Sequence, residues 1–259
     1  MQREDGLSPE FQLAAPQLGT EYRIYVDVPR ENTGPWPAVL ILDGDDQFRY
    51  AVTAYRRARR AGSVPPLLLV GVGYGASYTK PGNRRLRDYT PSPMKTEPES
   101  GGAEAFLGFL TGALWPEIRV RWPVDDGRRG IAGHSLGSLL VLHALFRPQP
   151  FFNRALASAP SLWWDNRVIL CNARALQETG IPLPARLFLG VGTRDSPSML
   201  ADLELFEDEL AAHPFPELER VCRRFPDRDH YNVLVDSFET GLAALFGSPA
   251  RESARAPSA

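Results

Sequence analysis

A serine in the middle of the chain is flanked by glycines in the order Gly133-His134-Ser135-Leu136-Gly137. Taken alone, this G-x-S-x-G pattern is weak, because glycine and serine are common residues. Here an apolar stretch precedes the pattern, and an amphipathic helical pattern over Leu136–Phe146 follows it without a gap. A strand that turns directly into a helix forces the serine into a strained backbone and exposes its hydroxyl. The pattern therefore predicts Ser135 as a nucleophile, with the glycines leaving room for the tight turn.

A serine hydroxyl is a poor nucleophile at neutral pH and needs a neighbouring base, and the chain contains four histidines. His134 lies inside the turn, where its side chain is expected to point away from the Ser135 hydroxyl. His143 lies too far along the following helix, and His213 precedes a proline at a helix end, where a solvated or capping histidine is common. His230 follows the last expected strand and precedes the last expected helix, where a hydrolase with this turn supplies its base. We therefore expect His230 to be the general base.

The base needs a carboxylate that orients its ring, and with this kind of turn the acid lies between the serine and the histidine in the chain. Asp195 fits best, because it follows an expected strand and a short Gly192-Thr193-Arg194 turn at the same edge of the sheet. Asp202, in the following helix, is the alternative. Either carboxylate could instead cap a helix or lie on the surface. The sequence favours Asp195.

Acyl transfer also needs N–H donors that stabilise the tetrahedral oxyanion. The Leu136 N–H, directly after the nucleophile, is the first expected donor. The second is expected from the loop after an early strand, where Gly44 would let the backbone turn so that the Asp45 N–H faces the nucleophile. The carboxylates of Asp43, Asp45 and Asp46 could alternatively hold Mg²⁺ or Ca²⁺, but such sites usually space their ligands more widely. We therefore expect no metal and no cofactor.

Apolar runs rich in Val, Ile and Leu alternate with stretches of helical periodicity, which indicates a mostly parallel sheet covered by helices on both faces. The expected strands are Tyr22–Val28, Ala38–Leu42, Leu67–Val72, Arg129–Ala132, Arg154–Ser158, Arg186–Val191 and Glu219–Phe225. The expected helices are Phe48–Ala61, Ala103–Val120, Leu136–Phe146, Ser198–Ala212 and Val233–Phe246. Ligands of such sheets bind beyond the carboxyl ends of the strands, where Ser135, Asp195 and His230 all fall. The predicted fold class is α/β, of the α/β-hydrolase type.

The 259 residues are expected to form one catalytic domain over 21–246, with an N-terminal extension over 1–20 and a disordered tail over 247–259. The segment Gly73–Gly102 is dense in Gly, Pro, Tyr and Arg, and a loop of that length is usually functional or disordered. The net charge of −2 and the pI of about 6.1 lack the basic character of proteins that bind nucleic acid or anionic membranes. No apolar run is long enough to span a bilayer, so a cytoplasmic location is expected.

Four segments together resemble the Putative esterase family, which includes enterochelin (trilactone siderophore) esterases, S-formylglutathione hydrolases and mycobacterial mycolyltransferases. They are Leu42-Asp43-Gly44, Asp88-Tyr89-Thr90-Pro91, Gly133-His134-Ser135-Leu136-Gly137 and Ser158-Ala159-Pro160-Ser161-Leu162-Trp163-Trp164. The last two resemble the siderophore-esterase branch in particular, and the resemblance covers most of the chain, from Glu21 to Phe246. It implies a serine hydrolase that acts through an acyl-enzyme, with the Asp45 and Leu136 amides as the oxyanion hole. It also implies that Arg85 lines the substrate cleft.

Four residues are assigned to substrate contacts: Arg85, His134, Trp163 and Trp164. The tryptophan pair could stack on an aromatic acyl group, although a pair beside an apolar strand often packs in the core. The Arg85 guanidinium could present paired donors to an anionic or oxygen-rich group. Alternatively, Arg85 could face solvent or pair with Asp88. The sequence leaves both choices open.

The expected activity is hydrolysis of a small-molecule ester, such as a siderophore trilactone, an aryl ester or a sugar-linked ester. An acyltransferase is the first alternative, because the fate of an acyl-enzyme depends on whether the site admits water or an alcohol. A catalytically inactive binding protein is the second, because a fold alone does not establish activity. The intact Ser135, Asp195 and His230 argue against the second alternative. No nucleic-acid or membrane partner is expected, and the sequence does not indicate an oligomeric state.

Overall fold

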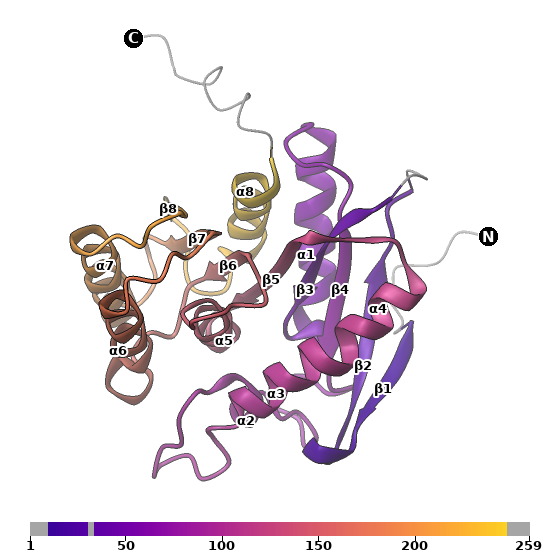
Figure 1. Cartoon of the computed structure of the whole chain (residues 1–259), viewed down its shortest axis with the longest axis horizontal. Helices are drawn as coiled ribbons and strands as arrows, with labels where there is room; N and C mark the ends of the chain where they lie inside the picture. The colour runs from indigo at the N-terminus through magenta and orange to yellow at the C-terminus, as the bar shows by residue number, and fades with distance from the viewer. Residues whose placement is uncertain (1–9, 31–33, 248–259) are drawn as a thin grey trace.

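The computed structural model describes residues 10–30 and 34–247, and its centre is an eight-stranded sheet (Figure 1). The strands are β1 (Phe11–Ala15), β2 (Thr20–Asp27), β3 (Trp36–Ile41), β4 (Leu68–Gly73), β5 (Val124–His134), β6 (Arg154–Ser158), β7 (Ala185–Gly192) and β8 (Leu218–Phe225). Their order across the sheet is β1-β2-β4-β3-β5-β6-β7-β8. β2 pairs antiparallel with β1 and β4, and all the other pairs are parallel. The predicted mostly parallel α/β sheet is confirmed.

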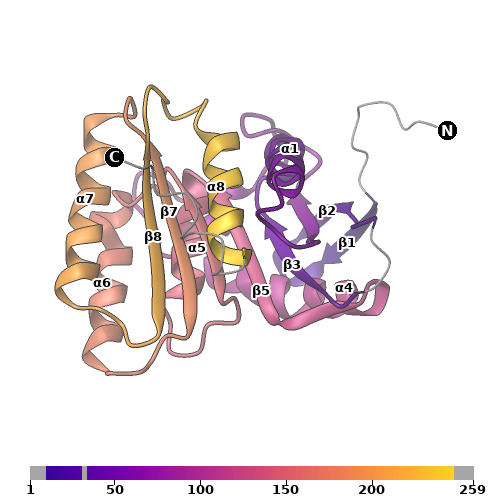
Figure 2. The same ribbon diagram turned by 90° about the horizontal axis from the view of Figure 1, so that it is seen from above.

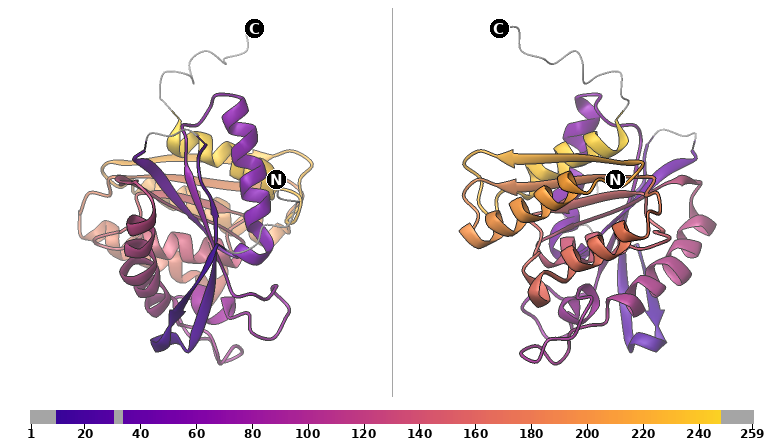
Figure 3. Two further views of the ribbon diagram at one scale, coloured as in Figure 1. Left: turned by 90° about the vertical axis from the view of Figure 1, so that its right-hand side faces the viewer. Right: turned by 60° about the vertical axis from the view of Figure 1, so that its left-hand side comes forward.

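Helices cover both faces of the sheet (Figures 2 and 3). One face carries α1 (Gly44–Arg60) and α8 (Leu234–Phe246), which also pack against each other. The opposite face carries α2 (Arg85–Tyr89), α3 (Ala103–Phe109), a π-helical turn (Leu110–Leu114), α4 (Trp115–Arg121), α5 (Leu136–Leu145), α6 (Trp164–Glu178) and α7 (Pro197–Ala212). A 3₁₀ turn (Pro16–Leu18) connects β1 to β2. Each face of the sheet therefore has its own apolar cluster.

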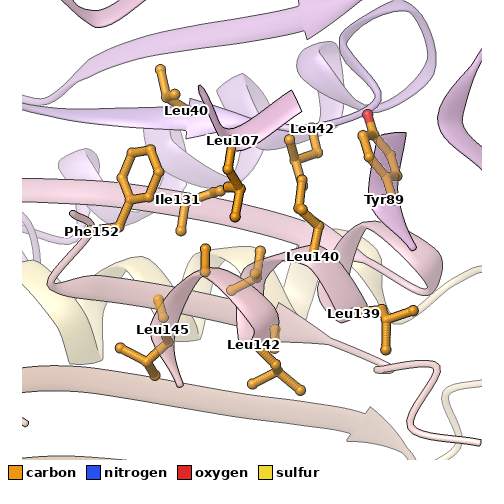
Figure 4. Close-up of a cluster of buried hydrophobic side chains, with 14 of the residues drawn as sticks. Leu40, Leu42, Tyr89, Leu107, Ile131, Leu139, Leu140, Leu142, Leu145 and Phe152 are labelled. Atoms are coloured by element: carbon orange, nitrogen blue, oxygen red, sulfur yellow. The ribbon is translucent and has the colours of Figure 1, made fainter. Parts of the chain in front are cut away.

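α5, which follows the predicted nucleophile, is buried on almost every side (Figure 4). All of its residues except His143 are buried, because the helix lies against β5 and β6 and is covered by α2 and α6. A helix that is apolar all round is typical of such a position. The amphipathic pattern predicted for this segment is therefore wrong. The burial holds the start of α5, and with it Ser135, in a fixed position.

The segment predicted as one helix over Ala103–Val120 contains a π-helical turn at its centre. This turn directly precedes α4, whose second residue is Pro116. Proline has no N–H, and in an α-helix its ring would clash with the carbonyl oxygen four residues earlier. The wider π-helical turn relieves this clash, so the helix continues past the proline.

One strand and two α-helices were not predicted. β1 lies within the expected N-terminal extension, but it pairs with β2, so the sheet begins at Phe11. α2 lies inside the segment Gly73–Gly102. α6 begins with weak helix formers, including the β-branched Val168 and Ile169, which explains why its sequence does not indicate a helix.

Of the expected tail, everything after Gly247 lies outside the described residues. Among the described residues, no helix combines the length and apolar character needed to cross a bilayer.

Candidate active site

Ser135 lies on the turn between β5 and α5. Its φ of 57° and ψ of −119° form a backbone conformation that residues with a side chain rarely adopt. A Cβ on Gly133 would lie 2.5 Å from the Gly137 carbonyl carbon, so this close approach requires a glycine. The turn places Ser135 at the carboxyl end of β5, beside the positively polarised start of α5.

His230 connects Ser135 to Asp195 by hydrogen bonds. The Nε2 of His230 lies 3.0 Å from Oγ of Ser135, and its Nδ1 lies 2.9 Å from Oδ2 of Asp195. The other oxygen of Asp195 accepts a hydrogen bond from the Ser196 N–H at 2.7 Å. The Asp195 carboxylate is 2% exposed, whereas the His230 side chain is 25% exposed. Such an arrangement can take a proton from the hydroxyl and stabilise the imidazolium that results.

The base and the acid are carried by loops that follow two neighbouring strands. β7 and β8 are parallel, so both loops leave the same edge of the sheet. The Asp227 N–H donates to Oγ1 of Thr193 at 3.0 Å, and the Arg194 N–H donates to the Arg228 carbonyl at 2.8 Å. A Cβ on Gly192 would clash with that carbonyl oxygen, so the contact requires a glycine. The loop after β8 is therefore fixed against the loop after β7.

Asp202, the alternative acid, has a different partner. Its carboxylate accepts a hydrogen bond from Nε of Arg167 at 2.7 Å. This ion pair connects α7 to α6. Of the two candidates, Asp195 is the carboxylate that the structure places against His230.

His134 lies beneath the His230 ring instead of facing the cleft. It is 7% exposed, its Nδ1 lies 3.1 Å from Oγ of Ser158, and its ring centre lies 4.8 Å from that of His230. Burial, reinforced by the neighbouring His230 ring and the Arg85 guanidinium, lowers the pKa of His134 to about 3. His134 does not line the cleft, where the substrate contact predicted for it would lie. A neutral, buried ring packs against the predicted base instead.

The two expected oxyanion donors lie in the first turns of two helices. Leu136 is the first residue of α5 and Asp45 the second residue of α1. N–H groups in the first turn of a helix have no intrahelical acceptor. The loop before α1 differs from expectation, because the left-handed conformation falls on Asp43, at φ 53°, and not on Gly44. A glycine is needed at 44 because a Cβ there would lie 2.9 Å from the backbone of Val72.

The three carboxylates of this loop bond to separate groups. The donors are Tyr25, Tyr74 and Gly75 for Asp45, Ser77 and Tyr78 for Asp46, and Gln47 and Arg85 for Asp43. Within residues 10–30 and 34–247, no three His, Cys, Asp or Glu side chains are arranged to hold a metal ion.

A cleft of about 630 Å³ opens above Ser135 and His230. Its other lining residues are Ser161, Trp163, Arg194, Asp195, Ser196, Ser198, Met199, Asp229 and Tyr231. The structure separates the two tryptophans: Trp163 is 47% exposed at the cleft, whereas Trp164 is 2% exposed. The Trp164 Nε1 donates to the Ser92 carbonyl at 3.2 Å. The Trp164 ring therefore packs in the core, the alternative that the sequence left open, and does not line the cleft.

Arg85 begins α2, and its guanidinium binds Asp43. Its Nε donates to Oδ1 of Asp43 at 2.9 Å, and its Nη2 donates to Oδ2 at 3.0 Å. Asp88, the partner considered from the sequence, instead accepts a hydrogen bond from Nε of Arg87 at 2.7 Å. Arg85 does not line the cleft described above. Its paired donors bind the buried carboxylate of Asp43 and not a group in the cleft.

Several cleft residues were not predicted from the sequence. Arg194 immediately precedes Asp195, and Asp229 and Tyr231 flank His230. Neighbours of catalytic residues on the same strand-end loops share their position at the sheet edge. That adjacency was the available signal for these three residues. Ser161 lies within the segment Ser158–Trp164 that resembles the siderophore-esterase branch, whereas Ser198 and Met199 carried no comparable signal.

The chain matches a known family over most of its length. The family described as "Putative esterase" matches residues 15–199. The siderophore enterobactin esterase of Emericella nidulans is 36% identical over 251 residues, which cover 80% of this chain and 81% of that protein. The siderophore triacetylfusarinine C esterase of Aspergillus fumigatus is 36% identical over 172 residues, which cover 62% of this chain and 58% of that protein.

Solved structures show the same fold. The BES protein from Bacillus cereus has a TM-score of 0.86 at 26% identity, over 96% of this chain and 98% of that one. The siderophore hydrolase EstA from Aspergillus nidulans has a TM-score of 0.77 at 27% identity, over 90% of this chain and 91% of that one. The chain belongs to the Putative esterase family, in its enterochelin esterase-like branch, and is a carboxylic ester hydrolase with the α/β-hydrolase fold.

Proposed function

We propose that this esterase works through an acyl-enzyme formed on Ser135, with His230 as general base and Asp195 as the acid that orients it. The observation that carries the proposal is the continuous hydrogen-bond chain from Asp195 through His230 to Ser135, at 2.9 Å and 3.0 Å. The strained backbone of Ser135 supports it, because strain of this kind is concentrated at functional sites.

In the first half of the reaction, Oγ of Ser135 attacks the ester carbonyl carbon while Nε2 of His230 takes the hydroxyl proton. Asp195 stabilises the imidazolium through Nδ1. The Leu136 and Asp45 N–H groups stabilise the oxyanion. The carbonyl then re-forms, the bond to the leaving alkoxide breaks, and His230 returns its proton to the departing alcohol.

In the second half, water takes the place of the alcohol. His230 accepts a proton from the water as it attacks the acyl carbon, and the second tetrahedral intermediate uses the same two N–H groups. Collapse of this intermediate breaks the bond to Oγ and releases the carboxylic acid. Ser135 recovers its proton from His230, so the enzyme ends as it began.

The cleft supports hydrolysis over transfer to an alcohol. Trp163 is 47% and Tyr231 is 86% exposed, so the space above Ser135 is open to water. An acyltransferase has to protect its acyl-enzyme from water, which a covered site does by desolvation.

We propose siderophore esters as the substrate class. Relatives that are 36% identical are named as siderophore esterases. A cleft of about 630 Å³ exceeds what a short-chain ester needs. Trp163 and Tyr231 present aromatic surface to a flat ring, and Arg194 and three serine hydroxyls present donors to oxygen-rich groups.

The substrate is tested by comparing kcat/KM for a catecholate trilactone, a feruloyl ester and a short-chain aryl ester. We expect the trilactone to exceed the other two by about 10-fold or more, since more of it can contact the cleft. An equal or lower kcat/KM for the trilactone would contradict the siderophore assignment and leave the esterase activity intact.

The mechanism is tested by a fluorophosphonate, which reacts with activated serines and leaves ordinary serines unmodified. Peptide mapping should find one adduct, on Ser135, and Ser135→Ala should give none. His230→Ala should slow labelling strongly, because the base would be missing. An adduct on another residue would contradict the assignment of Ser135.

A further inference from the structure

Asp43 lies beside the starts of the two helices that carry the proposed oxyanion donors. It is the residue before α1, its conformation is left-handed, and its side chain is fully buried. A Cβ placed on Gly137, in the first turn of α5, would lie 3.3 Å from Oδ2 of Asp43. The Asp43 carboxylate therefore lies beside the first turns of both α1 and α5.

Arg85 holds this carboxylate with two hydrogen bonds and is itself fixed by two aromatic rings. Its guanidinium carbon lies 4.7 Å from the centre of the Tyr78 ring and 5.6 Å from that of Tyr89. The Asp43 N–H donates to the Tyr89 hydroxyl at 2.9 Å, and Figure 4 shows Tyr89 close to Leu42, the residue before Asp43. The Arg85 side chain is 19% exposed, so the ion pair is largely shielded from water. Paired donors and two ring faces together fix the plane of the guanidinium.

An unpaired charge on Asp43 would oppose the proposed reaction. In that reaction an oxyanion develops at the first turns of α1 and α5, and a second negative charge nearby would repel it in a poorly screened interior. Burial raises the pKa of Asp43, and the Arg85 guanidinium acts in the opposite direction. With Arg85 in place, the pair adds no net charge to the site.

We propose that Arg85 is a positioning residue for the oxyanion hole, holding Asp43 in its left-handed turn and cancelling its charge so that the Asp45 and Leu136 N–H groups can stabilise the oxyanion. The inference rests on the proposed function. It gives Arg85 an effect on kcat for every ester, in contrast to a substrate-binding role, which would change KM for particular esters.

The first test measures kcat and KM of Arg85→Gln on a neutral aryl acetate and on an anionic aryl ester. We expect kcat to fall about 10-fold to 100-fold on both substrates, with KM within about twofold of the wild type. The kcat of Arg85→Lys should lie between those of the wild type and Arg85→Gln, because an ammonium keeps the charge and loses the paired geometry. Arg84→Gln is the matched control, since Arg84 is 45% exposed and pairs with the exposed Glu99. It should behave as wild type.

The sign of the remaining charge gives a second readout. Arg85→Gln leaves a buried negative charge beside the oxyanion, whereas Asp43→Asn leaves a positive one. We therefore expect a smaller loss of kcat for Asp43→Asn than for Arg85→Gln. The double variant Asp43→Asn/Arg85→Gln, with two neutral amides, should recover most of the kcat lost in Arg85→Gln. A purely structural ion pair predicts a double variant at least as impaired as either single variant.

Two results would overturn the role of Arg85. One is a rise in KM confined to the anionic ester with kcat unchanged, which would make Arg85 a substrate-binding residue. The other is a double variant with no recovery of kcat, although circular dichroism shows it to be folded. If Arg85→Gln does not fold, the role of Arg85 is tested by comparing Asp43→Asn with the double variant. The proposal then requires the double variant to retain a kcat near that of Asp43→Asn. Ser135→Ala in the same assay distinguishes a failure of the proposed mechanism from a failure of the role of Arg85. Activity in Ser135→Ala would overturn the mechanism itself.

Discussion

The floor of the cleft and its walls are built in different ways. The floor consists of Ser135, on the turn after β5, and of Asp195 and His230, on the loops after β7 and β8; His230 is hydrogen-bonded to both of the others. The walls include Trp163 and Tyr231, which are 47% and 86% exposed. Hydrogen-bonded positions beside the strand ends suit chemistry that needs constant geometry, whereas exposed side chains can change without disturbing the sheet. Substitutions in the floor should therefore act on kcat, and substitutions in the walls on KM.

The largest expected effect is at the centre of the floor. Ser135→Ala and His230→Ala should each lower kcat by a factor on the order of 10³ or more, because the nucleophile or its base is lost. The thermal midpoint should change little, since neither residue contributes to the apolar clusters. Steady-state kinetics and thermal unfolding of the same preparations check both points. A folded variant with kcat within tenfold of the wild type would remove that residue from the mechanism.

The next effect separates the two candidate acids. Asp195→Asn should lower kcat by about 10²-fold to 10³-fold, because the amide no longer holds the His230 ring in the required tautomer. Asp202→Asn should leave kcat near the wild-type value and at most lower stability, since it breaks only the ion pair with Arg167. Parallel kcat measurements on one ester decide between them. The opposite ranking would assign the acid to Asp202 in spite of the geometry.

Ser135 and Asp195 could be predicted from the sequence because the stretches before them have the apolar character of buried parallel strands. β5 is buried over Gly130–His134, and β7 is buried along almost its whole length. β8 is only partly buried, and His230 was predicted from its place between the last strand and the last helix. The choice between Asp195 and Asp202 needed the structure, because both lie near the start of α7 and spacing alone does not say which carboxylate faces the histidine.

The walls could not be predicted in the same way. Trp163 and Trp164 are adjacent residues of one type, and the structure sends one to the cleft and the other into the core. Three successive residues after this pair, Asp165–Arg167, have positive φ. Residue types alone do not predict such a conformation. The partner of Arg85 likewise lies 42 positions earlier in the chain, in a loop that only the folded sheet brings near.

A smaller effect concerns the buried side of the floor. The pKa of His134 is lowered to about 3 by burial, whereas an unfolded histidine titrates at about 6.5. Between these two pH values the unfolded chain binds a proton that the folded chain does not, so stability rises with pH through this window. His134→Asn should therefore lose less stability than the wild type on going from pH 8 to pH 5, by about 2 kcal/mol.

Denaturant unfolding of both proteins at the two pH values measures this difference. Burial also lowers the pKa of His143, but that residue is present in both proteins, so its contribution cancels. Asn keeps a polar atom that can bond to Oγ of Ser158, which limits the damage to packing. An equal loss of stability in the two proteins would show that His134 is not kept neutral by burial.

The smallest effect is expected in the walls, and it is selective. Trp163→Ala and Tyr231→Ala should each raise KM for a catecholate or feruloyl ester by about threefold to tenfold, which corresponds to the usual energy of one aromatic contact. KM for an aryl acetate should change less, because its small acyl group does not reach both walls. The control is Tyr50→Ala on α1, an aromatic residue with 38% exposure that does not line the cleft. If the wall variants lowered kcat on all esters and left KM unchanged, the walls would belong to the catalytic geometry, and the division between floor and walls would fail.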